Sequence, residues 1–95
     1  MSTQADTVVV FRRRFTPAGG AGAPVWRYYW HRKSSNGRKL SGGLEPFVSL
    51  RNCVKAAKRA NEGGTYDLAV PQFDTRGNLV GWLWQMHDGS QVRQP

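Results

Sequence analysis

The stretch that most constrains the fold of this chain is residues 25–61, VWRYYWHRKSSNGRKLSGGLEPFVSLRNCVKAAKRAN. Its first eight residues alternate as in a strand, with Trp26, Tyr28 and Trp30 on one face and Arg27, Tyr29 and His31 on the other. Asn36-Gly37 follows, and both of these residues tolerate the positive φ that a tight hairpin turn needs. The pattern therefore predicts an aromatic strand, a turn and a return strand over residues 38–41, with one face of the hairpin against a core.

The second part of this stretch predicts a basic amphipathic helix. Ser49 is a suitable N-cap for a helix from Leu50 to about Asn61, and Gly63-Gly64 would end it. At about 100° per residue, one side of the helix is made of small or apolar residues, namely Leu50, Cys53, Val54, Ala57 and Ala60. The other side carries Arg51, Lys55, Lys58 and Arg59. We expect Leu50, Val54 and Ala57 to be buried against a sheet.

Strand patterns also occur before and after this stretch. Residues 7–15 (TVVVFRRRF) read as a first strand, preceded by a disordered start at 1–6 and followed by a flexible glycine-rich connector at 17–24. Residues 66–73 and 79–86 read as two further strands joined by a turn, and Asp88-Gly89 introduces a short strand at 91–93. In the strand at 79–86, Val80, Trp82, Trp84 and Met86 share one face.

These elements indicate a partial repeat. The Trp82-x-Trp84 strand followed by Asp88-Gly89 echoes the aromatic strand followed by Asn36-Gly37, but the second copy ends without a helix. We predict one small domain, with a first unit at 7–64 and a partial second unit at 65–95. The predicted fold is α+β, with one helix packed on an antiparallel sheet, or on two abutting sheets, in the order β-β-β-α-β-β-β.

Charge is distributed unevenly along the chain. The formal net charge is +8, but residues 1–64 carry twelve Lys/Arg against three acids, whereas residues 65–95 carry two against three. The first part is therefore +9 and the second −1. An anionic partner is expected to meet the first hairpin and the helix.

Several function classes have little support in the composition. The single Cys53 cannot form an internal disulfide, and His31 and His87 lack both the spacing of a zinc site and a nearby carboxylate. Six acids without a close pair do not suggest acid–base catalysis. We expect a cytoplasmic protein that is not an enzyme and has no cofactor, no metal and no membrane anchor. On the buried side of its helix, Cys53 is expected to be a structural thiol.

The segments WRYYW, SSNGRKLSGG and VSLRNCVKAAKRAN resemble the unit of the YegP-like family, small bacterial, archaeal and phage proteins of unknown function. GNLVGWLWQMHDGSQV resembles a partial second unit. The resemblance implies three antiparallel strands with a helix across one face. It supplies no site residues, since the family has no established ones. The chain differs from the family in its insertion at 17–24 and in lacking a second helix.

Nucleic-acid binding through the hairpin and the helix face is the first functional hypothesis. WRYYWHRKSSNGRK also resembles the sheet of the N-terminal arm-binding domains of tyrosine recombinases, which read DNA with a three-stranded sheet and a following helix. Both DNA and RNA remain open as targets. The candidate contacts are Arg12, Arg14, Arg27, Tyr29, Arg32, Lys33, Arg38, Lys39, Arg51, Lys55, Lys58 and Arg59.

The tryptophans leave two interpretations open. Aromatic residues on alternate strand positions are most often core, which we predict for Trp26, Trp30, Trp82 and Trp84, whereas base stacking is the alternative. Tyr29, on the other strand face, is the better candidate for a surface contact. The second functional hypothesis is a protein-interaction module, such as a phage or bacterial factor that docks on a host protein. Because the second unit has no helix, we also predict a homodimer through Trp82, Trp84 and Met86.

Overall fold

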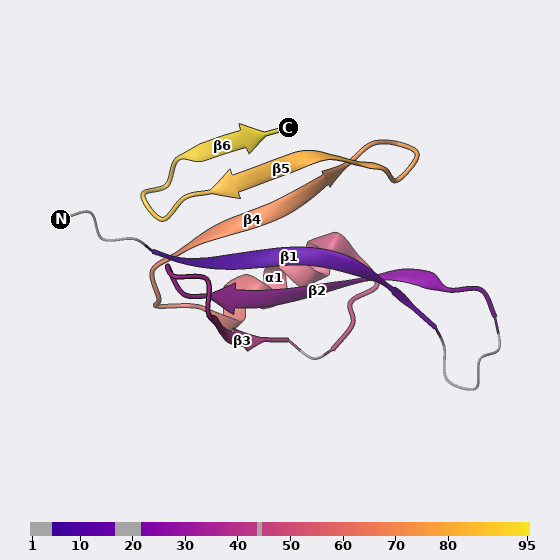
Figure 1. Cartoon of the computed structure of the whole chain (residues 1–95), viewed down its shortest axis with the longest axis horizontal. Helices are drawn as coiled ribbons and strands as arrows, with labels where there is room; N and C mark the ends of the chain where they lie inside the picture. Colours follow the sequence, from indigo (N-terminus) through magenta and orange to yellow (C-terminus); the bar gives the residue numbers. More distant parts are fainter. Residues whose placement is uncertain (1–4, 17–21, 44) are drawn as a thin grey trace.

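The computed structural model describes residues 5–16, 22–43 and 45–95. These residues form one six-stranded mixed sheet with a single helix against it (Figure 1), which confirms the α+β class. The elements are β1 (Asp6–Phe15), β2 (Val25–Lys33), β3 (Lys39–Gly42), α1 (Leu50–Ala60), β4 (Tyr66–Phe73), β5 (Leu79–Gln85) and β6 (Gln91–Gln94). The predicted disordered start at 1–6 is wrong for Asp6, which begins β1, and residues 1–4 and 17–21 lie outside the described chain.

The sequence predicted a purely antiparallel sheet, and this prediction is wrong for one pair of strands. Its strand order is β3-β2-β1-β4-β5-β6, and the two central strands, β1 and β4, run parallel while every other pair is antiparallel. Parallel neighbours need a long crossover connection, and here the segment that contains α1 provides it. The two three-stranded units therefore join at a parallel seam.

This seam determines which way the two units face. Val8 pairs with Leu68 across it, and both side chains point to α1. A half-turn about an axis that runs along the seam converts the strand order and directions of β1–β3 into those of β4–β6. Such a half-turn also exchanges the two faces of the sheet. The aromatic stripe of β2 consequently faces α1, whereas Trp84 of β5, paired with Ala69, lies on the opposite face.

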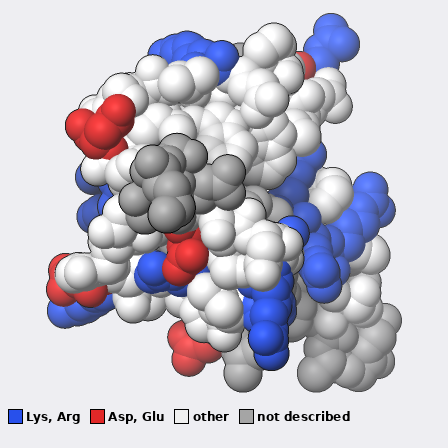
Figure 2. Space-filling model, turned by 60° about the vertical axis from the view of Figure 1, so that its left-hand side comes forward, with Lys and Arg blue, Asp and Glu red and all other residues white. Residues whose placement is uncertain are grey.

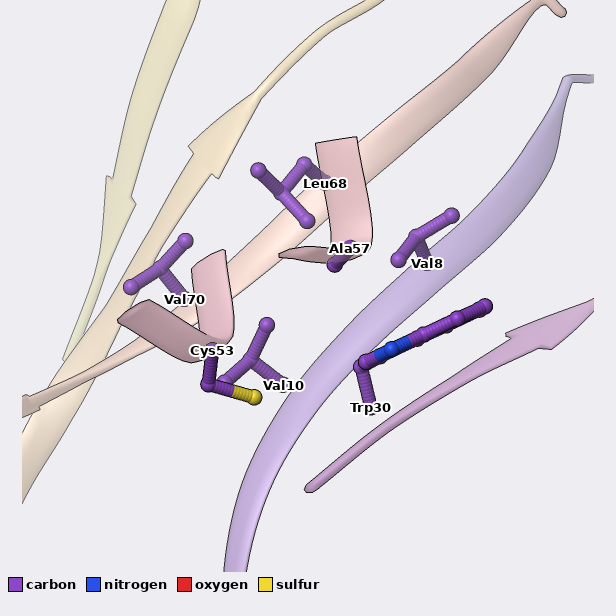
Figure 3. Packing of buried hydrophobic residues seen from close by; sticks show 7 residues of the cluster. All are labelled: Val8, Val10, Trp30, Cys53, Ala57, Leu68 and Val70. Atoms are coloured by element: carbon purple, nitrogen blue, oxygen red, sulfur yellow. The ribbon is translucent and has the colours of Figure 1, made fainter. Parts of the chain in front are cut away.

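The core lies between α1 and the central strands. Its buried side chains come from four elements (Figure 3): Val8 and Val10 from β1, Trp30 from β2, Cys53 and Ala57 from α1, and Leu68 and Val70 from β4. Small residues on the buried side of α1 let the helix lie close to the sheet. Burying each large aliphatic side chain contributes about 1.5–3 kcal/mol. Leu50 and Val54 are partly buried against this cluster, and Ala57 is fully buried, in agreement with the predicted orientation of the helix.

The ends of α1 also agree with the prediction. The Ser49 side-chain oxygen accepts a hydrogen bond from the Asn52 backbone N–H at 3.1 Å, as an N-cap does. At the other end, Asn61 is buried and its side chain donates to the Ala57 carbonyl at 2.7 Å. Gly63 then takes φ of +79°, a conformation that favours glycine.

The turns differ from the predicted ones in detail. In the β2–β3 turn only Gly37 has positive φ, and Asn36 does not. The Gly37 backbone N–H donates to the Ser34 carbonyl at 2.9 Å, and equivalent bonds occur at Gly77 and Gly89. The β2–β3, β4–β5 and β5–β6 hairpins thus use a turn with glycine in its last position, which needs one residue of positive φ rather than two.

The core prediction for the tryptophans is confirmed only for Trp30, which is 8% exposed. Trp26 is 42% exposed because it lies in the part of β2 that α1 does not cover. Trp82 and Trp84 are half-buried on the face opposite α1. The alternating sequence pattern assigned all four tryptophans to the core. It failed for β5 because the half-turn between the units places Trp82 and Trp84 on the face opposite α1.

Candidate nucleic-acid interface

The side of β1–β3 that faces away from α1 carries a cluster of cations. We call it the basic open face, and its charged residues are Arg13 of β1, Arg27 and Lys33 of β2, and Lys39 of β3. Their side chains are exposed or half-buried. The only acid in these three strands is Asp6, which lies on the α1 side. Strand pairing thus gathers cations that are up to 26 positions apart in the sequence.

Aromatic rings occupy the middle of the basic open face. Phe11 and Tyr29 are cross-strand neighbours with ring centroids 5.8 Å apart and planes 22° from parallel. The His31 ring, which also comes from β2, lies 5.0 Å from the Phe11 ring. A hollow of about 230 Å³ adjoins these rings and also reaches Arg13 and Lys39. The prediction that Tyr29 lies on the face away from the tryptophans of its own strand agrees with this geometry.

His31 is a ring of this face whose charge can change near neutral pH. Burial lowers its pKa from the usual value, and the nearby charges of Lys33, Lys39 and Arg13 lower it further. Its Nε2 atom is buried and has no hydrogen-bond partner among the described residues. The lowered pKa keeps the ring neutral among these positive charges, and a bound anion would offset their repulsion of the protonated ring.

The predicted contacts do not form one surface. Arg51, Lys55, Lys58 and Arg59 are exposed on α1, on the opposite side of the sheet, and Arg38 is exposed in the β2–β3 turn. Figure 2 shows blue Lys and Arg side chains at the top, on the left and at the lower right of the view, with red Asp and Glu side chains among them on the left and in the lower part. A ligand that lies flat on the basic open face does not reach the helix cations.

Arg32 has intramolecular partners rather than a free head group. Its guanidinium donates to the Asp6 carboxylate at 2.9 Å, to the Asn61 side-chain oxygen at 3.1 Å and to the Thr65 carbonyl at 3.4 Å. It also lies over the Tyr66 ring at 5.8 Å. Arg32 thus joins the start of β1 to the end of α1 and to the segment before β4. Nothing in the sequence pattern indicated this role.

Arg12 and Arg14 lie on the α1 side of β1 and stack on aromatic rings. The Arg12 guanidinium lies 4.1 Å from the ring centroids of both Trp26 and Phe73, and Arg14 lies 5.2 Å from Trp26. Cation–π contacts of this kind contribute about 0.5–2 kcal/mol each. The Arg12 guanidinium makes no hydrogen bond to another described residue. Its N–H donors are therefore available to a ligand.

Arg12 lines a second hollow, which we call the seam hollow. β1 and β4 pair only as far as Val9 with Ala69, and beyond these residues the two strands separate (Figure 1). The space between them has a volume of about 280 Å³. It is lined by Phe11, Arg12, Trp26, Pro71, Phe73, Leu79 and Trp82. Because Phe11 borders this hollow and the one beside His31, the two are adjacent on the sheet.

The region of β5 and β6 on the sheet face opposite α1 is apolar. Trp84, Met86 and Val92 line a shallow hollow of about 330 Å³, and the Trp84 indole N–H donates to the Gln94 side chain at 2.9 Å. Val92 is 51% exposed. Within the described chain no helix covers this region. The predicted dimer residues thus share a surface, but contact with a second copy stays a prediction.

Two further reactive groups among the described residues are the Cys53 thiol and the His87 ring. Cys53 is fully buried, and burial raises its pKa to about 11, as expected for a structural thiol. The prediction that His87 has no nearby carboxylate is wrong, since its Nδ1 lies 2.7 Å from the Asp67 carboxylate. The twenty residues that separate them concealed this pair. No group of three potential metal ligands occurs among the described residues.

Comparison with known proteins adds no assignment. No family model, curated protein or solved structure matches this chain. The resemblances to the YegP-like family and to the recombinase domains therefore stay predictions. In the described residues, no helix combines the length and the apolar character that crossing a membrane requires.

Proposed function

We propose that this is a cytoplasmic, non-enzymatic protein that binds nucleic acid through its basic open face. One observation carries the proposal: Arg13, Arg27, Lys33 and Lys39 lie on one side of three adjacent strands, without an acid on that side of those strands. Lys and Arg clusters of this kind contact phosphates. The Phe11 and Tyr29 rings between these cations favour a ligand with aromatic bases over a simple polyanion.

The number of cations gives a measurable expectation. If all four contact phosphates, the logarithm of the binding constant should fall with the logarithm of salt concentration, with a slope of about −3. The four exposed cations of α1 lie on the other side of the sheet, so they are expected to add long-range attraction but no direct contact. Binding should therefore depend mainly on the open face.

Two matched charge-reversal variants test this proposal. One replaces Arg13, Lys33 and Lys39 with Glu, and the other replaces Lys55, Lys58 and Arg59 with Glu. Both change the formal charge equally, so a difference between them reports location rather than total charge. Affinity for a labelled 20-nucleotide strand and for a duplex of the same length is measured by fluorescence anisotropy over a series of salt concentrations, and circular dichroism checks the fold.

We expect the open-face variant to lose roughly 100-fold in affinity and to flatten the salt slope by about 2, as three lost phosphate contacts would. The helix variant should lose less than about tenfold, with its slope nearly unchanged. The opposite result would move the interface to α1. If the wild-type protein binds neither ligand at low salt, the proposed function is wrong.

A second candidate function is protein association, and one observation favours it. The half-turn between the units leaves Trp82, Trp84 and Met86 on a face that no described helix covers. We propose that a second copy of the chain packs there. Light scattering at micromolar concentration should then give twice the chain mass of 10.7 kDa, and Met86→Asp should restore the single mass. A constant mass of 10.7 kDa on concentration would remove the dimer.

A further inference from the structure

The seam hollow is where the sheet departs most from a regular ladder. Phe11 and Pro71 follow the last parallel pair by two residues on each strand, so they face each other across the gap. Tyr29 is the neighbour of Phe11 on one side, and Trp82 is the neighbour of Pro71 on the other. The rings of Tyr29, Phe11 and Trp82 therefore form a row at right angles to the strands.

The walls of this hollow combine two kinds of chemistry. Phe11, Pro71 and Trp82 provide flat apolar surface, whereas Arg12 provides hydrogen-bond donors that no described residue uses. Arg12 is held in place by its stacking between Trp26 and Phe73. A volume of about 280 Å³ is at the lower end of the range for small-ligand pockets, on the order of 300–1,000 Å³. The hollow is thus suited to a single flat ring system whose edge bears acceptors.

We propose that the seam hollow holds one unpaired base of a single-stranded nucleic acid whose phosphates lie on the basic open face. The inference rests on the proposed function and narrows its ligand class. A base in a duplex is stacked on both faces and paired along one edge, so it cannot enter without first being extruded, which costs a few kcal/mol. A single strand that crosses the row of rings presents its bases freely. The two surfaces are continuous, since Phe11 borders both hollows.

The hollow makes Trp82 the residue to test. We expect Trp82→Ala to weaken binding of a 20-nucleotide single strand by roughly 5- to 100-fold, the loss typical of one stacked base. The salt slope should not change, because no phosphate contact is removed. Trp84→Ala is the matched control: it removes the same side chain from the same strand outside the hollow, and should change affinity less than about threefold. Wild-type protein should bind the single strand at least tenfold more tightly than the duplex.

Arms with oligothymidine and with oligouridine of equal length separate DNA from RNA, and preferential binding of either over its duplex supports the inference. Should the duplex and the single strand bind equally, or should Trp82→Ala and Trp84→Ala weaken binding alike, the hollow does not hold a base, although nucleic-acid binding itself still stands. If Trp82→Ala changes the mass measured by light scattering but not the affinity for the single strand, Trp82 serves self-association and the inference is overturned. Absence of binding to any oligonucleotide by the wild-type chain would overturn the proposed function and the inference together.

Discussion

The two halves of the sheet are built from the same parts but lie in different surroundings. β1–β3 and β4–β6 are both three-stranded meanders, and the corresponding turns at Gly37 and Gly89 have equivalent hydrogen bonds. In the first half α1 covers Trp30 and part of Tyr28 of the aromatic stripe, whereas in the second half the stripe lies on the opposite face and is uncovered. A repeated sequence pattern thus specifies the same local structure twice, but the parallel seam decides whether its aromatic residues become core or surface.

The largest expected effect concerns the helix that only the first half possesses. Ala57→Asp places an unpaired charge in the core and should destabilise the chain by more than about 3 kcal/mol. Because Leu68 and Val70 of β4 pack on the same core, we expect both halves to unfold together in urea. Ala60→Asp, at the exposed last residue of the same helix, is the control. If hydrogen exchange in β4–β6 stays slow in Ala57→Asp, the halves are independent.

The next largest expected effect is the difference in stability loss between the aromatic stripes of β2 and β5. Trp30→Ala should cost about 3–5 kcal/mol, as expected for a large side chain lost from a core. Trp84→Ala removes the equivalent kind of residue from the uncovered stripe and should cost roughly 1 kcal/mol. Urea midpoints measure both values. Equal losses for the two variants would mean that the β5 stripe is also a buried core, as in a tight dimer.

Arg32 tests how the halves are joined. Arg32→Ala leaves the Asp6 carboxylate and the Asn61 side chain without their partner and should cost about 1–3 kcal/mol. These groups are partly exposed, with 19% and 27% of the Arg32 and Asp6 side chains accessible, so the lower part of that range is expected. Arg32→Lys keeps the charge but loses the planar fork, and should recover less than half of the loss. Full recovery would show that charge alone is needed.

The smallest expected effect is the pH dependence of His31. Its pKa is lowered by burial and by neighbouring cations, so the folded chain binds fewer protons than the unfolded chain. Stability should therefore be complete above the usual value of about 6.5 and fall slightly at lower pH. A bound phosphate reverses the sign of the local charge and favours the protonated ring. Affinity for a single strand should therefore rise, by less than about tenfold, when the pH is lowered from 7 to 5.5. Anisotropy on His31→Asn should show no such rise; an equal rise would assign the proton elsewhere.

The sequence was informative wherever local chemistry determines structure. The Ser49 cap, the apolar stripe of α1 and the start and end of β4 were predicted correctly because each depends on residues close together in the chain. The parallel pairing of β1 with β4 was missed, since no periodicity states which strands become neighbours after a crossover. The Arg32 cluster and the His87–Asp67 pair join residues twenty or more positions apart, and the seam hollow exists only where two distant strands separate.

The parallel seam also has a consequence for how fast the chain folds. It pairs residues sixty positions apart, such as Asp6 with Tyr66, whereas the β1–β2 hairpin pairs residues as close as Phe15 and Val25. Closing the longer loop costs more chain entropy before any contact offsets it, so we expect the hairpins to form early and the seam last. In stopped-flow experiments Leu68→Ala should then mainly accelerate unfolding, while Trp30→Ala slows refolding.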